Sequence, residues 1–195
     1  MLILSKGNRD ESNTTRAQGG IASVLSGEDS FQEHVQDTLD AGGGLCDEGR
    51  VRLCVEAGPE AIHWLESLGV HFANLANQGG YDLGREGGHS KRRVAHAKDL
   101  TGRVVEDVLL EAVEANPNIE LREHQLGVDL ITTRRIGLQT PTDQCIGAYV
   151  MDKRTGSIQT IEASATILAT GGAGKVYLYT SNPDIATGDG LAMVW

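Results

Sequence analysis

Apolar residues recur at helical spacing through most of the first 116 residues. This pattern predicts helices at 31–41, 48–57, 59–68 and 101–116. The dipeptide Asp29-Ser30 and Asp47 are N-cap candidates for the first two, and glycine follows the expected ends of the first and third. Pro59 is placed in the first turn of the third helix, because proline suits that position and disrupts a helix interior.

Beyond Pro117 the apolar pattern changes to a period of two, which is typical of strands. The predicted strands, with a short one at the N-terminus, are 2–5, 119–122, 128–132, 145–151, 157–161 and 165–169. The fourth and fifth form a hairpin around 153–156, and the first and last are apolar and expected to be buried. Residues 6–20 are expected to be loop, and 21–25 a helix or a short strand.

This order of elements predicts an α/β fold, with a sheet that carries an inserted antiparallel hairpin. The first predicted strand has no preceding βα unit, and the final apolar run, 190–195, has no stop signal. We therefore expect residues 1–195 to be part of one domain that is truncated at both ends.

Composition narrows the possible partners. Glycine makes up 25 of the 195 residues, against 4 prolines, which suggests a backbone that approaches a ligand closely in several places. The net charge of -10 disfavours nucleic acid and anionic membranes, and no apolar run reaches membrane-spanning length. Cys46, Cys54 and Cys145 have no metal-binding spacing, so we expect buried, reduced thiols in a cytoplasmic protein.

Three glycine-rich segments could bind a ligand through their backbones. They are 13–20, 170–174 at the end of the last predicted strand, and 188–190, where Asp189 lies between two glycines. Amides of glycine turns, with threonine hydroxyls nearby, can bind phosphate or flavin carbonyls, and α/β sheets bind ligands at the carboxyl ends of strands. The alternative is that these glycines serve tight turns that need positive φ. The usual dinucleotide fingerprint, G-x-G-x-x-G, is missing from the sequence.

A second candidate site is the basic stretch 85–93, which is followed by His96 and Asp99 in an otherwise acidic chain. Its cations would favour a dicarboxylate, and Glu86, beside two glycines, could hold a substrate ammonium group. The alternative is a solvated basic loop with self-contained salt bridges. The remaining histidines, expected to be structural or surface residues, are His34, His63, His71 and His124.

Several segments resemble the L-aspartate oxidase family in order and spacing. They are Leu4-Ser5-Lys6-Gly7, 17–22 (AQGGIA), 85–90 (REGGHS) with Arg92-Arg93, His96-Ala97, Thr101-Gly102, 168–172 (LATGG), Asn182-Pro183-Asp184 and 188–190 (GDG). The resemblance covers essentially the whole chain, but only the first part of the family's length. The wider group comprises the succinate dehydrogenase and fumarate reductase flavoproteins.

The resemblance implies a Rossmann-like FAD-binding domain of the glutathione-reductase type. The residues that it implies as FAD contacts are Lys6, Asn13, Thr14, Thr15, Arg16, Ala17, Gln18, Gly19, Gly20, Val128, Thr170, Gly171 and Asp189. Relatives that hold FAD covalently carry a histidine at the position of Asn13, so non-covalent FAD is implied. Val128 would contact the adenine end through its backbone, and Thr170 and Gly171 would lie near the pyrophosphate.

The resemblance also implies a reaction. FAD would take a hydride from the α-carbon of L-aspartate to give iminoaspartate, and oxygen or fumarate would reoxidise the flavin, with hydrogen peroxide formed from oxygen. Glu86, as the glutamate of the REGGHS run, would meet the substrate amino group. The product would enter quinolinate and NAD biosynthesis, with quinolinate synthase as a pathway partner.

Parts of the family are missing from residues 1–195: the N-terminal G-x-G-x-x-G unit, the capping domain and the closing FAD segment. We therefore expect this chain alone neither to bind FAD tightly nor to oxidise aspartate. Two alternatives stay open. The first is a succinate or fumarate flavoprotein, against which Asn13 and Glu86 argue, and the second is a non-catalytic remnant. We also expect Gly19-Gly20, Gly171-Gly172 and Asp189 to line one groove, with Glu86 near its far end.

Overall fold

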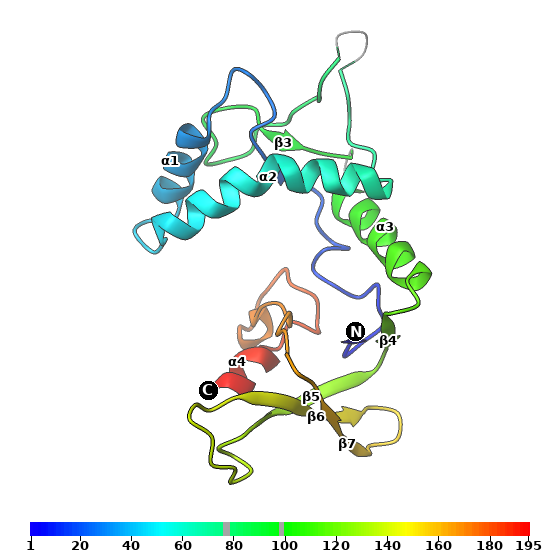
Figure 1. Cartoon of the computed structure of the whole chain (residues 1–195). Coiled ribbons are helices and arrows are strands. Elements are labelled where there is room, and N and C mark those ends of the chain that lie inside the picture. Colours follow the sequence, from blue (N-terminus) through cyan, green and yellow to red (C-terminus); the bar gives the residue numbers. More distant parts are fainter. Residues whose placement is uncertain (76–78, 98–99) are drawn as a thin grey trace. The chain divides into compact units, whose positions relative to one another are not determined.

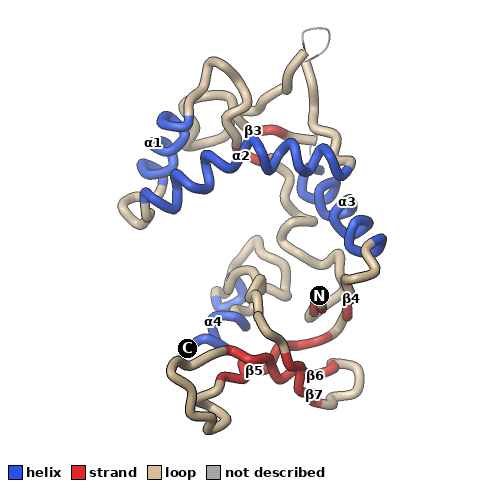
Figure 2. The backbone as a smooth tube through the Cα atoms, in the orientation of Figure 1, coloured by secondary structure: helices blue, strands red, loops and turns tan. Residues whose placement is uncertain are grey.

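The computed structural model describes residues 1–75, 79–97 and 100–195, and the chain divides into two compact units (Figure 1). Residues 14–112 form the first, which we call the helical unit. Residues 1–13 and 113–195 form the second, which we call the sheet unit. Of the four α-helices in the described residues, three begin in the helical unit, and the longest described strands belong to the sheet unit (Figure 2).

The helices of the helical unit begin and end where local signals predict. They are α1 (Phe31–Ala41), α2 (Glu48–Leu68) and α3 (Thr101–Ala115). The Ser30 hydroxyl caps α1 by accepting the Glu33 amide at 3.2 Å, and the Asp47 carboxylate caps α2 by accepting the Arg50 amide at 2.9 Å. Gly69, with φ of 113°, ends α2 in the left-handed conformation that favours glycine.

One prediction for these helices is wrong, because α2 runs without a break through Pro59. Val55, Ile62 and Leu65 are buried and lie on both sides of the proline along one face. A proline in a helix interior costs about 3 kcal/mol, whereas each fully buried side chain of this kind contributes about 1.5–3 kcal/mol. Burial of the shared face therefore outweighs the loss of one backbone hydrogen bond.

The core of the helical unit joins α2 and α3 to a short ladder. Strand β2 (Ile21–Ala22) pairs antiparallel with β3 (Val94–Ala95), so that Ile21 lies opposite Ala95. The buried residues that pack together are Ile62, Leu65, Val70, Phe72, Leu83, Ala95 and Val105. This core supports the segments on either side of β2 and β3 within the unit, which include residues 14–20 and 85–93.

The sheet unit contains both parallel and antiparallel pairing. Strand β1 (Leu2–Leu4) pairs parallel with β4 (Glu120–Arg122). The antiparallel sheet has the order β5-β6-β7, and its strands are β5 (Gln125–Thr132), β6 (Cys145–Asp152) and β7 (Ile158–Glu162). The predicted hairpin around 153–156 is the β6–β7 connection, in which Gly156 has φ of 74°. A short turn, η2 (Gly174–Val176), and helix α4 (Asp189–Val194) complete the unit.

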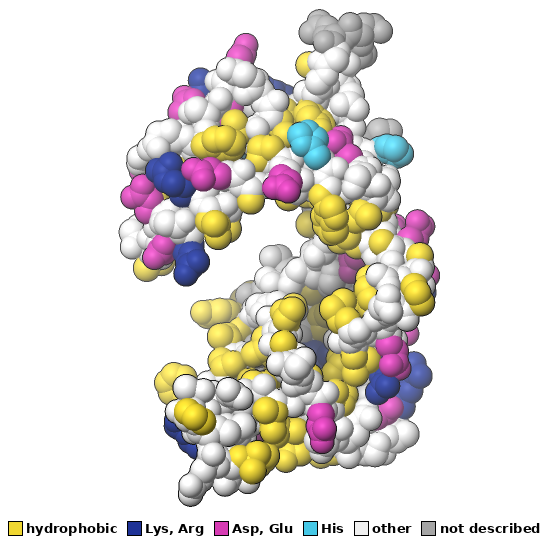
Figure 3. Space-filling model, viewed as in Figure 1, with side chains coloured by type: hydrophobic (Ala, Val, Ile, Leu, Met, Phe, Trp, Pro, Cys, Tyr) yellow, Lys and Arg dark blue, Asp and Glu magenta, His cyan; other side chains and the backbone are white. Residues whose placement is uncertain are grey.

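The buried strand expected at 165–169 is not formed. These residues are in no strand, and Ile167 is 85% exposed. A strand is buried only when neighbours pair with its backbone and cover its faces, and within the described residues none pairs with this segment. Leu178, further along the same unit, is 88% exposed, and Figure 3 shows hydrophobic side chains at the surface of the visible face.

Two smaller expectations also need correction. Strand β1 is half-buried rather than buried, since its ladder has a single partner strand. Cys54 is exposed and Cys46 and Cys145 are half-buried, because the apolar face of α2 that is buried does not include Cys54. The mixed α/β class is confirmed, and no helix in the described part of the chain is long and apolar enough to cross a membrane.

Candidate functional site

In the sheet unit, the sequence-distant residues Lys6 and Asp189 form an ion pair. Lys6 Nζ lies 2.5 Å from Asp189 Oδ2 and also donates to the carbonyl of Ile185 at 2.8 Å and to the Thr187 hydroxyl. Partial burial acts to raise the pKa of Asp189, but hydrogen bonds from Lys6 and Thr187 outweigh it, so the pKa is lowered. Two residues predicted to contact FAD are thus held together, and the Asp189 carboxylate is stabilised in its ionised form.

Glycine turns surround this ion pair. Asp189 begins α4 directly after Gly188, whose φ is 80°. A Cβ at Gly190 would lie 2.1 Å from the Thr170 hydroxyl, so only glycine fits there. The Gly188 amide donates to the carbonyl of Gly172 at 3.2 Å. The 170–174 and 188–190 segments are therefore packed directly against each other.

Asn13 joins the same group. Gly171 has φ of 68°, and a Cβ built there would lie 3.8 Å from Asn13 Nδ2. Both residues are exposed. Within the sheet unit, the structure thus brings together five of the predicted cofactor contacts, which are Lys6, Asn13, Thr170, Gly171 and Asp189.

Val128 lies on the strand that packs against α4. The β5–β6 register skips Val128, since Gly127 pairs with Val150 and Asp129 with Tyr149. A bulged residue of this kind leaves the regular ladder, which frees its backbone for other partners. A Cβ at Gly127 would lie 3.3 Å from Met193 Sδ in α4, so this bulge adjoins the helix that carries Asp189.

In the helical unit, the 14–20 loop is fixed by backbone contacts to the start of α3. The Ala17 amide donates to the carbonyl of Thr14, and the Gly102 amide donates to the carbonyl of Ala17, both at 3.0 Å. The Thr101 hydroxyl donates to the carbonyl of Gly19 at 2.7 Å. The loop therefore has a defined shape although it contains no regular element.

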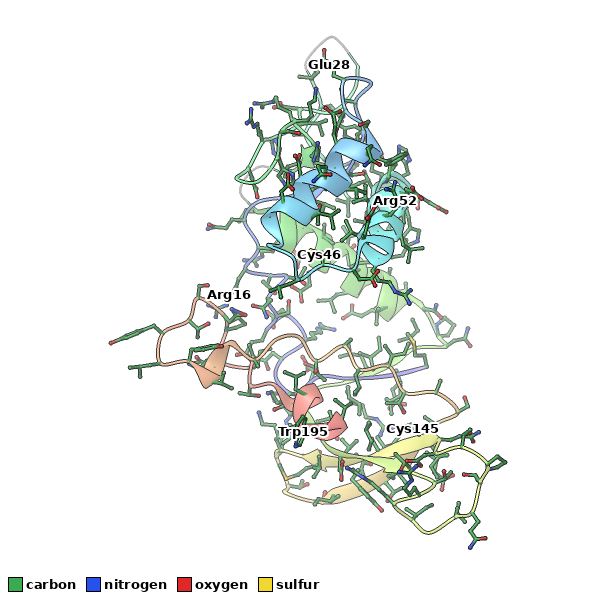
Figure 4. All side chains as sticks on the ribbon, turned by 90° about the vertical axis from the view of Figure 1, so that its left-hand side faces the viewer. Arg16, Glu28, Cys46, Arg52, Cys145 and Trp195 are labelled. Carbon is green, nitrogen blue, oxygen red and sulfur yellow. The ribbon has the colours of Figure 1, made fainter. Side chains whose placement is uncertain are left out.

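Side chains of this loop face outward, with one exception. Thr14, Arg16 and Gln18 are exposed, and Figure 4 labels Arg16. The Thr15 hydroxyl instead hydrogen-bonds the carboxylate of Glu106 on α3. A ligand at this loop would meet exposed backbone and polar side chains, while Thr15 serves the loop's attachment to α3.

Glu86 lies directly against the glycine turn. A Cβ at Gly19 would lie 2.5 Å from Glu86 Oε1 and 3.3 Å from its Cδ. A Cβ at Gly20 would lie 2.3 Å from the carbonyl oxygen of Ala95. Gly20 is therefore required by close packing against backbone, and the acid predicted to bind an amine is in contact with the turn predicted to bind the cofactor.

The structure gives two of the four cations in 85–93, Lys91 and Arg93, salt bridges to acids of the same unit. Arg93 is fully buried and donates to both carboxylate oxygens of Asp29 at 2.8 Å and to Asp37 at 2.7 Å. Lys91 lies 3.4 Å from Glu33, and Arg92 donates to the carbonyl of Leu83 at 2.7 Å. The expectation that the basic stretch surrounds a dicarboxylate is therefore wrong for Arg93, which solvent cannot reach.

The histidines follow their predicted structural or surface roles, and His34 is the buried one. Its ring meets that of His89 edge-on at 5.8 Å. Burial, then the neighbouring charge of Arg93, lowers the pKa of His34. His63 and His71 are exposed, and Asp99 lies outside the described residues.

Sequence reasoning missed Asp29 and Asp37, which are the partners of Arg93. Asp29 was assigned only as a helix cap, a role that Ser30 takes. Asp37 follows the buried His34 by one turn of α1, so both lie on the same face. The sequence signal that could have identified Asp37 is the polar pair His34 and Asp37, three residues apart on a helix whose apolar residues predict a buried face.

Comparison with known proteins gives one family and several relatives. A family model described as "FAD binding domain" matches residues 1–195. The chain is 52% identical over its whole length to L-aspartate oxidase 1 of Ralstonia nicotianae, and 49% identical to L-aspartate oxidase of Pseudomonas aeruginosa. It spans 36% and 37% of those relatives' lengths.

A solved structure is also similar. FrdA of the Escherichia coli quinol fumarate reductase matches with a TM-score of 0.89 and 30% sequence identity. The match covers 99% of this chain and 32% of that protein.

Proposed function

Because the chain belongs to the FAD binding domain family, we propose that residues 1–195 are the FAD-binding part of an L-aspartate oxidase. The observation that carries the proposal is 52% identity over the whole chain to an L-aspartate oxidase, against 30% to the fumarate reductase protein. The chain covers about a third of these relatives, so the activity is proposed for the complete gene product.

The residues present fit a flavin. Gly19, Gly20 and Gly171 are exposed and have no side chain between a ligand and their backbone. Asn13, Thr14, Gln18 and the Lys6–Asp189 pair would add polar contacts, in a Rossmann-like arrangement of the glutathione-reductase type. Asn13 offers no nucleophile for a covalent flavin link, so FAD would be bound non-covalently.

The remaining predicted contacts would act through the backbone or from the loop surface. These are Thr15, Arg16, Ala17, Val128 and Thr170. The skipped position of Val128 in the β5–β6 register supports a backbone contact to the adenine end. Thr15 would contribute its main chain, because its hydroxyl bonds Glu106.

Glu86 would hold the ammonium group of the substrate. When bound, FAD supplies the acceptor for the hydride that leaves the α-carbon of L-aspartate. Glu86 is the exposed acid in contact with Gly19, so an amine that it binds would be held beside the glycine turn. An ionic hydrogen bond of this kind also selects an amino acid over a plain dicarboxylate.

A second candidate is a fumarate reductase-like flavoprotein, which the similarity to FrdA supports. A succinate or fumarate enzyme has no substrate ammonium group, so the carboxylate of Glu86 beside Gly19 would have no binding role in such an enzyme.

Fumarate also has a role in the first candidate function, as an alternative to oxygen in reoxidising the flavin. We place the protein in the cytoplasm, at the start of quinolinate and NAD synthesis, with quinolinate synthase next in the pathway.

The test is to purify the complete gene product with FAD and measure peroxide formation with L-aspartate and with succinate. We expect activity with aspartate only. We expect Glu86→Gln to lower kcat/KM for aspartate by between about 10-fold and about 100-fold, the usual effect of losing a charged hydrogen bond, and to leave fumarate reduction nearly unchanged. Oxidation of succinate without oxidation of aspartate would contradict the proposal and favour the second candidate.

A further inference from the structure

We propose that Asp37 is a positioning residue for Glu86: from α1, it fixes the loop 86–90 so that the Glu86 carboxylate stays against Gly19. The inference rests on the proposed function, because it concerns the acid assigned there to the substrate ammonium. It adds a residue that does not touch the substrate and that lies outside the sequence motif carrying Glu86.

The carboxylate of Asp37 is the acceptor that ties this loop to the helix. Asp37 Oδ2 accepts hydrogen bonds from the Ser90 amide at 2.7 Å, the Ser90 hydroxyl at 2.8 Å and Arg93 Nη1 at 2.7 Å. Burial acts to raise the pKa of Asp37, but the bonds from Ser90 and Arg93 outweigh it and lower the pKa, so the group is ionised at neutral pH. Charged acceptors form the stronger class of hydrogen bond.

The other hydrogen bonds near Glu86 are local to the loop, and one of them joins Arg85 Nε to the carbonyl of His89 at 2.9 Å. Gly87 and Gly88 have no side chains, and Gly88 has φ of 84°. The His89 amide donates to the carbonyl of Glu86 at 3.3 Å, which closes a tight turn. Since a two-glycine segment is conformationally free, the firm anchor nearest to Glu86 on its C-terminal side is Ser90.

Helix α1 also packs against this loop at two other points. A Cβ at Gly88 would lie 3.6 Å from the Cβ of Ala41, which is ordinary packing distance. One turn before Asp37, the buried His34 meets the ring of His89. The loop therefore lies along a face of α1 that includes His34, Asp37 and Ala41.

Arg93 in turn fixes Asp37. It is fully buried, and its other donors bind both oxygens of Asp29, so the guanidinium cannot change its orientation without breaking that bidentate pair. Asp29, Arg93, Asp37 and Ser90 are thus joined by two ion pairs and then by hydrogen bonds from Ser90, which lies four residues from Glu86. A rigid support of this kind sets the geometry of a binding group.

The test compares Asp37→Asn with Asp40→Asn in the complete FAD-loaded gene product. Asp40 lies on the same helix and is exposed, with Gln36 as its hydrogen-bond donor, so it is a matched control. We expect Asp37→Asn to raise KM for L-aspartate and lower kcat/KM by between about 10-fold and about 100-fold, as displaced binding groups do. Fumarate reduction should change by less than about 2-fold, because fumarate has no ammonium group.

Ser90→Ala gives a milder form of the same perturbation, and it serves if Asp37→Asn does not fold. It removes one of the three hydrogen bonds to Asp37, so a smaller loss with the same aspartate preference is expected. The double variant Glu86→Gln/Asp37→Asn should be little worse than Glu86→Gln alone, since Asp37 acts through Glu86.

Each outcome separates the inference from the proposed function. If the unmodified enzyme does not oxidise aspartate, the proposed function fails. If it does, equal losses of aspartate oxidation and fumarate reduction in Asp37→Asn or Ser90→Ala would overturn the positioning role. Additive losses in the double variant would overturn it as well.

Discussion

Each unit contains an ion pair built by residues distant in sequence, and the two differ in exposure. In the helical unit, the side chains of Arg93, Asp29 and Asp37 are 0%, 1% and 16% exposed. In the sheet unit, those of Lys6 and Asp189 are 20% and 29% exposed. We call Asp29, Arg93 and Asp37 the buried set, and the guanidinium at its centre is closed to any ligand. The Lys6–Asp189 pair instead lies partly at the surface, beside glycine turns.

The difference teaches how to interpret charged residues near a candidate site. A buried charge must be fully satisfied inside the protein, and it then serves the fold. A charge that keeps part of its surface can still meet a ligand. On this criterion the basic 85–93 stretch contributes support through Arg93, while Lys6 and Asp189 stay available for binding.

The largest expected effect comes from breaking the buried set. Arg93→Met leaves the buried carboxylate of Asp29 and the partly buried one of Asp37 without their cation, so we expect the free energy of unfolding to fall by about 3–5 kcal/mol. Urea denaturation of the chain followed by circular dichroism measures this change. Arg103→Met is the matched control, because its contact to Asp107 at 3.9 Å is exposed on both sides. Equal effects of the two variants would refute the contrast between buried and exposed charges.

A smaller effect is expected in the sheet unit. Lys6→Met removes the partner of Asp189, and because the pair is partly exposed we expect about 1 kcal/mol of stability to be lost. We also expect FAD to bind about 10-fold more weakly to the complete gene product, a change of about 1.4 kcal/mol that flavin fluorescence titration measures.

Lys175→Met is the control for Lys6. It belongs to the same unit, and the side chain of its partner Asp184 is 88% exposed. FAD affinity should be unchanged in this variant. If Lys6→Met loses stability and keeps its affinity for FAD, then the Lys6–Asp189 pair serves the fold and not the cofactor. Exposure would then fail to distinguish charged residues that support the fold from those that bind a ligand.

The sequence predicted the parts of the fold that local chemistry decides. The caps Ser30 and Asp47 and the stop at Gly69 depend on neighbouring residues only, and all three are confirmed. The continuity of α2 through Pro59 and the exposure of 165–169 depend on what packs against them, so the local pattern was misleading. Pattern alone carries no information on such distant partners.

The candidate site divides in the same way. The residue types of the glycine turns and Glu86 could be selected from sequence, because close backbone approach and amine binding need those residues. The contact between Glu86 and Gly19, and the ion pair of Arg93 with an acid 64 residues away, could not. Both depend on β2 and β3 pairing, which only two residues of each strand define.

The smallest expected effect tests whether the buried set also resists a change in pH. Burial, with Arg93 and His89, lowers the pKa of His34 from its usual 6.5, against the opposing charges of Asp29 and Asp37. The unfolded chain therefore binds a proton at His34 at a higher pH than the folded one does. Stability from neutral His34 is complete above about pH 6.5 and is lost as the pH falls through the lowered folded value.

His34→Asn removes this titration and keeps a neutral polar group. Comparing urea midpoints of the two proteins at about pH 7.5 and about pH 5.5, we expect the unmodified chain to lose more stability than the variant. Hydrogen exchange of α1 should show the same loss, because His34 lies on that helix. The Lys6–Asp189 pair should not respond in this range, since the pKa of Asp189 is lowered from 3.8. An equal pH response in both proteins would mean that His34 protonates without disturbing the Arg93 set, and that this set tolerates an added positive charge.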